Sequence, residues 1–415
     1  MNTRKLTSMG RRRFLSHLSK IGIGGAALRY LTPKALAEQT SNPKKQVPRL
    51  ARLEHTNHEA VVAGKEAPKR KPVYYTIPRD EWIEIEARNR AAKRLQKMIN
   101  KRVEHGVVRA GVDLEASPSQ REIVLDYAEV DGKSPDIEYN ELVDQLPSKM
   151  SGSVGTSRHK EQRQDIPVRP RKSELSTHDI SGGATSNYNY DYEYSNLPAG
   201  ALFLGKDYKD EWSGGTTGTP AYSDQHGQVM VTSGHTYLED LDDTDNWDGS
   251  DTVGSDVYET KQPIHTSHTV GNVYRGEHTL ANDASRDMDA ALIRMDAGVS
   301  LTHRLASNDG PTTRNAEIYA TIGWDAISDG DSSQTKQGSK TAITSGSLRT
   351  AYANQTYEIN ADSAGGDSGG PIYKKTYYEH PTDFLSVGGI VSYGGGSYCG
   401  GIHIGKIESK YNIRV

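Results

Sequence analysis

The chain contains very little cysteine. Cys399 is the single cysteine among 415 residues, so no disulfide bond can form within one chain. With no second cysteine beside it, Cys399 has no partner for a metal site, and we expect it to act as a small packing residue.

Long hydrophobic stretches are also missing, which leaves no permanent membrane anchor. The mildly apolar run at residues 21–31 is too short and too rich in glycine to span a bilayer, and Arg29 interrupts it. Before it, Arg-Arg-Arg-Phe-Leu at residues 11–15 resembles the twin-arginine export motif, and Ala-Leu-Ala at 35–37 follows as a cleavage site. We therefore expect a twin-arginine signal peptide over 1–37 and a protein secreted in folded form. A basic tail without structure is the alternative.

Positive charge is scarce in one half of the chain and abundant in the other. The net charge is −4, and residues 201–415 hold 16 Lys and Arg against 29 Asp and Glu, a net charge of −13, so residues 1–200 carry +9. An acidic half rich in Gly, Thr and Ser suggests a halophilic protein, and an acidic mesophilic protein is the alternative. Because the basic residues lie outside the acidic half, we expect no nucleic-acid partner.

Residues 38–179 differ in character from what surrounds them. Apolar residues recur at helical spacing between Asp80 and Gly106, where a helix is expected to begin and end. The segment is thus predicted to be a small α+β unit with polar ends. Its predicted parts are a flexible lead over 38–72, a helix over 80–105, a strand over 121–127, a short helix over 139–146 and a polar, cleavable linker over 147–178.

A glycine-rich turn surrounds Ser368, in the run Gly-Asp-Ser-Gly-Gly-Pro at residues 366–371. A serine hydroxyl becomes a nucleophile only when a base takes its proton and donors wait for the developing oxyanion. Glycines allow the tight backbone that such donors need. A turn with an incidental serine is the simpler alternative, but six consecutive residues resemble the nucleophile motif of chymotrypsin/trypsin-like serine proteases. The resemblance implies an oxyanion hole made by the N–H groups of Gly366 and Ser368.

The same family resemblance supplies a base and an acid. A β-prone run at 228–232 leads into Ser-Gly-His, which makes His235 the expected base. Asp-Ala-Ala-Leu-Ile at 289–293 resembles the strand that carries the family's aspartate. Asp287 lies two residues earlier, on the same face of a strand, and remains the alternative to Asp289. The order His235, Asp289, Ser368 matches the chymotrypsin-type order.

The resemblance covers residues 180–415 and implies an all-β protease domain of two six-stranded antiparallel β-barrels, with the α+β segment as its pro-segment and partner. It implies a serine endopeptidase that cleaves protein or peptide substrates through an acyl-enzyme and needs no cofactor. A protease-fold binding or adhesion protein without turnover is the alternative. We expect the basic pro-segment to dock on the acidic domain and to assist its folding or block its cleft.

A specificity pocket can also be compared with the family. Asp362 lies six residues before Ser368, as does the trypsin aspartate that pairs with a substrate Lys or Arg. Substrate-binding walls are expected at Ser392, Tyr393, Gly394 and Gly401, where glycines would leave the pocket open. Cleavage after Arg or Lys is therefore predicted. His403 is a competing signal, because a histidine in the pocket would favour an acidic group. Ala364 and Cys399 take the place of the disulfide that many relatives have here.

The start of the protease domain resembles a mature N-terminus. Ile-Ser-Gly-Gly at 180–183 is similar to the first residues of trypsin-like and streptogrisin-like proteases. In trypsin-type enzymes the freed amine pairs with the aspartate before the serine, here Asp367. Bacterial relatives often use an arginine instead, so cleavage before Ile180 need not be the activating step.

The acidic run at residues 240–251 offers oxygen ligands of the kind that calcium prefers. It lacks EF-hand spacing, because Trp247 takes a ligand position and Gly254 stands where the bidentate glutamate belongs. A solvated acidic loop is the favoured interpretation, and we predict no metal site there.

Overall fold

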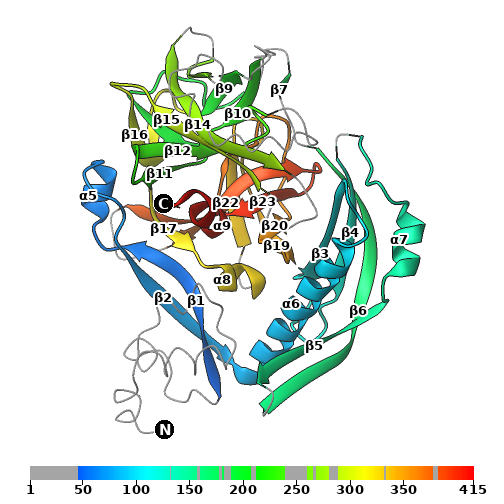
Figure 1. The fold of residues 1–415 in the computed structure, drawn as a ribbon. Helices are drawn as coiled ribbons and strands as arrows, with labels where there is room; N and C mark the ends of the chain where they lie inside the picture. Colours follow the sequence, from blue (N-terminus) through cyan, green and yellow to red (C-terminus); the bar gives the residue numbers. More distant parts are fainter. Residues whose placement is uncertain are drawn as a thin grey trace, which may run out of the picture.

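The computed structural model describes residues 45–415 apart from 131, 157–158, 177–179, 182–187, 207–211, 239–258, 265–267, 280–287, 331–332 and 377–381. The residues up to 176, which we call the N-terminal unit, run from blue to green-cyan in Figure 1 and flank the remainder of the chain. Its elements are β1 (Gln46–His55), α5 (His58–Val62), β2 (Arg70–Pro78), α6 (Arg79–Ile99), β3 (Val107–Asp113), β4 (Ile123–Val130), α7 (Tyr139–Gln145), β5 (Lys149–Thr156) and β6 (His159–Leu175).

The following residues are almost entirely β-structure, which confirms the predicted all-β class, and they include a closed six-stranded barrel. One sheet has nine strands in the order β24-β11-β12-β15-β14-β13-β9-β10-β7. Its members are β7 (Ile180–Ser181), β9 (Leu202–Lys206), β10 (Trp212–Thr216), β11 (Thr219–Ser223), β12 (Gly227–Thr232), β13 (Glu259–Lys261), β14 (Thr269–Thr279), β15 (Met288–Met295) and β24 (Ile413–Arg414).

A second sheet of fifteen strands joins both parts of the chain, in the order β2-β1-β17-β22-β21-β18-β19-β3-β4-β6-β5, with β8, β16, β20 and β23 attached beside this path. Its C-terminal members are β8 (Asn196–Ala199), β16 (Ser300–Ala306), β17 (Thr313–Ile322), β18 (Ser333–Gly338), β19 (Ala342–Tyr352), β20 (Thr356–Ile359), β21 (Pro371–Thr376), β22 (Asp383–Gly394) and β23 (Cys399–His403). The helices among these strands are α8 (Trp324–Ser328) and α9 (Ile404–Tyr411). No helix in the described ranges is long and apolar enough to cross a membrane.

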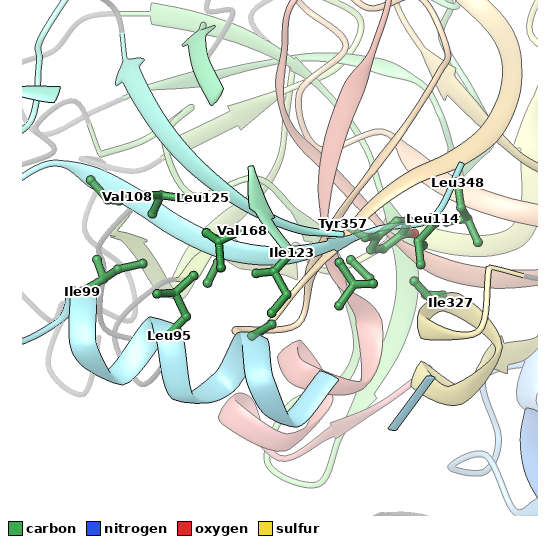
Figure 2. Packing of buried hydrophobic residues seen from close by; sticks show 14 of the residues in the cluster. Leu95, Ile99, Val108, Leu114, Ile123, Leu125, Val168, Ile327, Leu348 and Tyr357 are labelled. Atoms are coloured by element: carbon green, nitrogen blue, oxygen red, sulfur yellow. The ribbon is translucent and has the colours of Figure 1, made fainter. Parts of the chain in front are cut away.

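Helix α6 follows the predicted apolar spacing. Leu95 and Ile99 are fully buried and face Val108, Ile123 and Leu125 of β3 and β4 (Figure 2). The helix ends at Ile99, six residues before the predicted end, although apolar spacing continues to Val103. The N–H groups of both Arg102 and Val103 bond to the Ile99 carbonyl, so the chain leaves the helix in a turn toward β3.

The predicted flexible lead at the start of the N-terminal unit is instead partly sheet. β1 pairs with β2 over its whole length and with β17 at Arg52↔Ile322. Val47 is buried in this strand, and Arg49 is buried as well because Asp329 neutralises it, with Nη2 2.5 Å from Oδ1. The partner lies 280 residues away, so the sequence around Arg49 looks polar and basic until the chain has folded.

The predicted polar linker is also sheet. β6 runs parallel to β4 from Ile123↔Val168 to Val130↔Leu175 and antiparallel to β5. Its arginines find acidic partners on other strands, as Arg171 does with Asp126 of the neighbouring strand β4, Nε to Oδ1 3.0 Å. A Lys/Arg-rich segment therefore becomes a central strand because tertiary ion pairs absorb its charge.

One hydrophobic core spans the N-terminal unit and the C-terminal strands. A single cluster contains Leu95 and Leu125 from the former, and Ile359 and Val391 from the latter. Strand β3 pairs directly with β19, at Ala351↔Val112. The predicted α+β unit therefore shares a core with the C-terminal strands, which cover part of its apolar face.

Candidate active site

Asp289 and His235 form a buried pair between two antiparallel strands. Asp289 is on β15 and His235 is in the turn after β12. Asp289 Oδ2 lies 2.7 Å from His235 Nδ1, while Oδ1 accepts the backbone N–H groups of Gly234 (2.7 Å) and His235 (2.8 Å). A side chain at Gly234 would meet the Glu277 carbonyl oxygen at 2.2 Å, so glycine is needed here. This arrangement places the proton on Nδ1 and leaves Nε2 as the basic nitrogen.

Asp289 stays ionised despite its burial. Burial alone would raise its pKa, but the neighbouring His235 and the hydrogen bond between them outweigh it, and the pKa falls to about 2. Ser392 contributes, because its hydroxyl donates to Oδ2 at 2.5 Å. We predicted Ser392 as a substrate-binding residue, and the structure shows its side chain bound to Asp289.

The turn that carries Ser368 has the backbone that its glycines allow. Gly366 and Gly369 have φ angles of 98° and 84°, in the left-handed region that favours glycine. The Gly366 carbonyl accepts hydrogen bonds from the Thr216 hydroxyl (2.6 Å) and the Ser339 hydroxyl (2.7 Å). These bonds tie the turn to β10 and to the residue after β18.

The Ser368 turn lies against the His235 turn. The Thr216 N–H donates to the Ser368 carbonyl at 2.7 Å, and the Thr232 hydroxyl donates to the Thr216 carbonyl at 2.9 Å. A Cβ built on Gly369 would lie 3.0 Å from the backbone nitrogen of Ser233, two residues before His235. The structure therefore brings the turns that carry Ser368 and His235 together.

Asp367, next to Ser368, is held by donors from one hairpin. Its carboxylate accepts from Lys336 Nζ, from the N–H groups of Lys340 (2.9 Å) and Thr341 (3.0 Å), and from the Thr341 hydroxyl (2.6 Å). The ammonium and the carboxylate are both fully buried. Sequence reasoning missed Lys336. The backbone of Ile180 pairs with Gly214 of β10, and the cation that holds Asp367 is the side chain of Lys336.

His278 is a second residue that sequence reasoning missed. It is the cross-strand partner of Asp289, its ring centroid is 5.5 Å from that of His235, and its Nδ1 is 2.7 Å from the Leu238 carbonyl. His235, His278 and Asp289 offer ligand atoms within 4.8 Å of one another. We assign no metal to them, because the His235–Asp289 hydrogen bond uses two of these groups. Only the strand register, which the sequence does not reveal, brings His278 here.

The predicted pocket differs from expectation at its base and its walls. Asp362 is exposed, so its carboxylate is hydrated and not buried. A Cβ on Gly400 would meet the Tyr393 ring at 1.9 Å, and one on Gly401 would meet Ile372 at 2.4 Å. Both glycines therefore make room for the protein's own side chains, and Gly401, which we predicted to leave the pocket open, lies against Ile372 instead.

His403 does not act as a free pocket residue. Its Nε2 donates to the Ile322 carbonyl at 2.9 Å, and its ring meets Trp324 edge-on with centroids 5.4 Å apart. Burial lowers the pKa of His403 to about 4. A neutral ring bound in this way supplies no charge for an acidic substrate group.

Cys399 is buried and free, as predicted, and burial raises its pKa to about 12. Asp287 and the acidic run at 240–251 lie outside the described residues, as does the signal segment.

A groove of about 910 Å³ begins where β22 ends. It is lined by residues of the N-terminal unit and, from the C-terminal strands and loops, by Arg349, Gly394, Gly395, Gly396 and Tyr398. Ser176 also lines the groove and pairs with Gly394: its N–H donates to the Gly394 carbonyl (3.2 Å), and its carbonyl accepts the Gly394 N–H (3.1 Å). The N-terminal unit thus touches a residue that we predicted to bind substrate.

Comparisons with known proteins point to one family. Residues 223–409 match the family model described as Trypsin. Solved structures similar to the chain include Protease A of Thermobifida fusca (16% identity, 53% of this chain and 97% of that chain, TM-score 0.34). Nocardiopsis protease NAPase is similar too (16%, 53% and 98%, TM-score 0.34). So is a glutamic-acid-specific serine protease described as using a histidine triad in substrate binding (17%, 53% and 100%, TM-score 0.35). A comparison with curated proteins found no match. Over residues 223–409, the chain matches the trypsin-like serine protease family.

Proposed function

We propose that this protein is a serine endopeptidase that hydrolyses peptide bonds through an acyl-enzyme. The observation that carries the proposal is the buried His235–Asp289 pair beside the Ser368 turn. Ser368 attacks the substrate carbonyl, and His235 takes the hydroxyl proton and delivers it to the leaving amine. Asp289 holds the imidazole and stabilises its cation, and the N–H groups of Gly366 and Ser368 bind the oxyanion. Water then releases the acyl group by the same steps.

The test is labelling by a fluorophosphonate, which reacts only with an activated serine. Wild type should be labelled and should hydrolyse peptides, whereas Ser368→Ala and His235→Ala should do neither while keeping the wild-type melting temperature. A folded wild type that is not labelled would favour the alternative, a protease-fold binding or adhesion protein.

The proposed preference for Arg or Lys depends on Asp362. The exposed position of this carboxylate means that water screens its attraction for a substrate cation, so the preference would be modest. Profiling a peptide library with wild type and Asp362→Ser tests it. An equal profile for the two proteins would remove Asp362 from the specificity site.

Secretion by the twin-arginine route and processing before Ile180 are proposals that follow from the sequence motifs. The pairing of Ser176 with Gly394 supports the docking of the pro-segment on the cleft. N-terminal sequencing of the protein recovered from the medium would test both the export signal and the mature terminus.

A further inference from the structure

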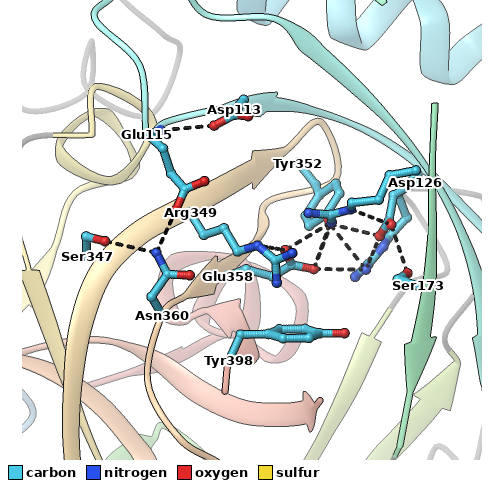
Figure 3. A network of polar contacts seen from close by, with 12 residues as sticks. Asp113, Glu115, Asp126, Ser173, Ser347, Arg349, Tyr352, Glu358, Asn360 and Tyr398 are labelled. Carbon is cyan, nitrogen blue, oxygen red and sulfur yellow. Dashed lines mark hydrogen bonds and ion pairs between the residues drawn. The ribbon is translucent and has the colours of Figure 1, made fainter. Parts of the chain in front are cut away.

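A buried charge network joins the N-terminal unit to the protease strands (Figure 3). Arg109 of β3 lies at its centre, with Nη2 2.7 Å from Asp126 of β4 and 3.3 Å from Glu358 of β20. Arg171 of β6 makes a second bridge, with Nη2 3.1 Å from Glu358. The Tyr352 hydroxyl donates to Glu358 at 2.7 Å. The network therefore crosses the boundary between the two parts of the chain.

These charges are balanced only when both parts are together. Asp126 and Glu358 are fully buried, and Arg109 is 3% exposed. Burial alone would raise the pKa of Asp126, but the charges of Arg109 and Arg171 outweigh it and keep that pKa below its ordinary value. Taking Arg109 away would leave buried carboxylates without their partner, which is strongly unfavourable.

Arg109 also reaches the strand beside the candidate active site. Its guanidinium lies between two tyrosine rings, 4.1 Å from the centroid of Tyr352 and 4.7 Å from that of Tyr393, and it donates to the Tyr393 hydroxyl. Tyr393 follows Ser392, which holds Asp289, and precedes Gly394 at the edge of the groove. A cation on an aromatic face, combined with a hydrogen bond to its hydroxyl, fixes the ring and with it the backbone of this strand.

We infer that Arg109 is a positioning residue for the segment 392–394, and that the N-terminal unit is a permanent part of the active enzyme. This inference rests on the proposed peptidase function. The unit shares a core with the C-terminal strands, adds strands to both ends of their sheet, and lines the groove together with Gly394. A substrate that extends along segment 392–394 would therefore meet a surface that both parts of the chain build.

The test compares two substrates in the full-length protein: a tetrapeptide amide, which uses segment 392–394, and a single-residue ester, which uses only Ser368 and its immediate surroundings. Tyr393→Phe keeps every charge of the network and removes only the tyrosine hydroxyl that accepts from Arg109. We expect kcat/KM for the tetrapeptide to fall about tenfold, mainly through KM, with the ester within about twofold of wild type. Arg109→Lys keeps the charge but not the planar fork and should lose a similar amount.

Tyr222→Phe and Arg169→Met are the matched controls, because both residues lie outside the network and the groove. In a double-mutant cycle, Arg109→Lys and Tyr393→Phe together should cost little more than either change alone. Equal losses on ester and tetrapeptide, or full additivity in the cycle, would overturn the inference. A wild type that hydrolyses neither substrate and resists fluorophosphonate would overturn the proposed function instead. Melting curves identify any variant that fails to fold.

Discussion

At the scale of single residues, the candidate site depends on one carboxylate. Asp289 accepts four hydrogen bonds, from two backbone N–H groups, His235 and Ser392. The bonds from the Gly234 and His235 N–H groups orient the backbone of the His235 turn. The bonds from His235 Nδ1 and the Ser392 hydroxyl fix those two side chains. The same group therefore sets both the position and the tautomer of the base.

Asp289→Asn is expected to lower kcat by about 10³–10⁴-fold, because an amide can donate to Nδ1 and so favour the wrong tautomer. Ser392→Ala removes one donor and should cost about tenfold. The measurement is steady-state hydrolysis at neutral pH, with Asp287→Asn as the matched control. If Asp287→Asn is the more damaging of the two aspartate changes, the assignment of the acid is wrong.

His403 predicts a loss of stability in acid. Burial lowers its pKa to about 4, so between pH 6.5 and 4 the unfolded chain binds a proton that the folded protein does not. The contribution is complete above pH 6.5 and decreases as the pH falls toward 4, by about 3 kcal/mol in all. His403→Gln keeps a donor for Ile322 and should flatten the dependence of melting temperature on pH over this range. His105→Gln, at an exposed position, should leave it unchanged. A wild-type slope in His403→Gln would refute this origin.

At the scale of elements, the hairpin of β18 and β19 organises the nucleophile turn. Lys336 is on β18, and Lys340 and Thr341 form the connection to β19. A side chain at Gly338 would lie 2.2 Å from Asp367 Oδ1, which explains the glycine there. The hairpin thus supplies the cation for Asp367 without any chain cleavage.

Lys336→Met should leave Asp367 as an unpaired buried charge and lower the free energy of unfolding by about 3–5 kcal/mol. Peptidase activity should fall as well, because the turn at Ser368 loses its anchor. Chemical denaturation measures the first effect, with Lys340→Met as the control that keeps every backbone donor. Adding Asp367→Asn should restore part of the lost stability, and no recovery would mean that the ion pair is not the cause.

The end of β6 makes a prediction about substrate access. Ser176 uses the N–H and C=O of Gly394, so an extended peptide must compete for them. Ser176→Pro removes one donor and should lower KM for tetrapeptides several-fold, about the effect of one hydrogen bond. Ser176→Ala keeps the backbone bonds and should match wild type. An unchanged KM in Ser176→Pro would show that this contact does not limit substrate binding.

At the scale of the whole molecule, the fifteen-stranded sheet joins regions that the sequence separates. β1 and β2 extend it beyond β17, and β3 to β6 extend it beyond β19 (Figure 1). Removing the N-terminal unit would expose two sheet edges and an apolar face. Unpaired edges and exposed core residues favour association over independent folding.

A chain cut between the N-terminal unit and Ile180 should therefore remain one particle. Size-exclusion chromatography of the cut protein should give a single peak with the elution volume of the intact chain, and denaturing mass spectrometry should find both fragments in it. Moderate salt should not separate them, since buried ion pairs are poorly screened. Separate elution of the fragments under native conditions would contradict the shared core.

Local sequence was sufficient for features that local chemistry controls. The glycines at 366 and 369 indicated a tight turn, and apolar spacing located α6 to within a few residues at its start. The single cysteine excluded disulfides, and the strand-like run that follows Asp289 placed that residue on β15. In each case the cause lies within a few residues of its effect, so it can be read along the chain.

The tertiary structure alone decided which charges are paired and at which glycines another side chain occupies the space where a Cβ would lie. Arg49 and Arg171 look like solvated charges, yet both are neutralised by carboxylates distant in sequence, and strands form where polar linkers were predicted. Lys336 meets Asp367 only after a hairpin has formed, and Tyr393 fills the space beside Gly400 only after β22 and β23 have paired. A polar or charged residue can be buried when a partner pairs with it, and the sequence does not say which residues will become neighbours.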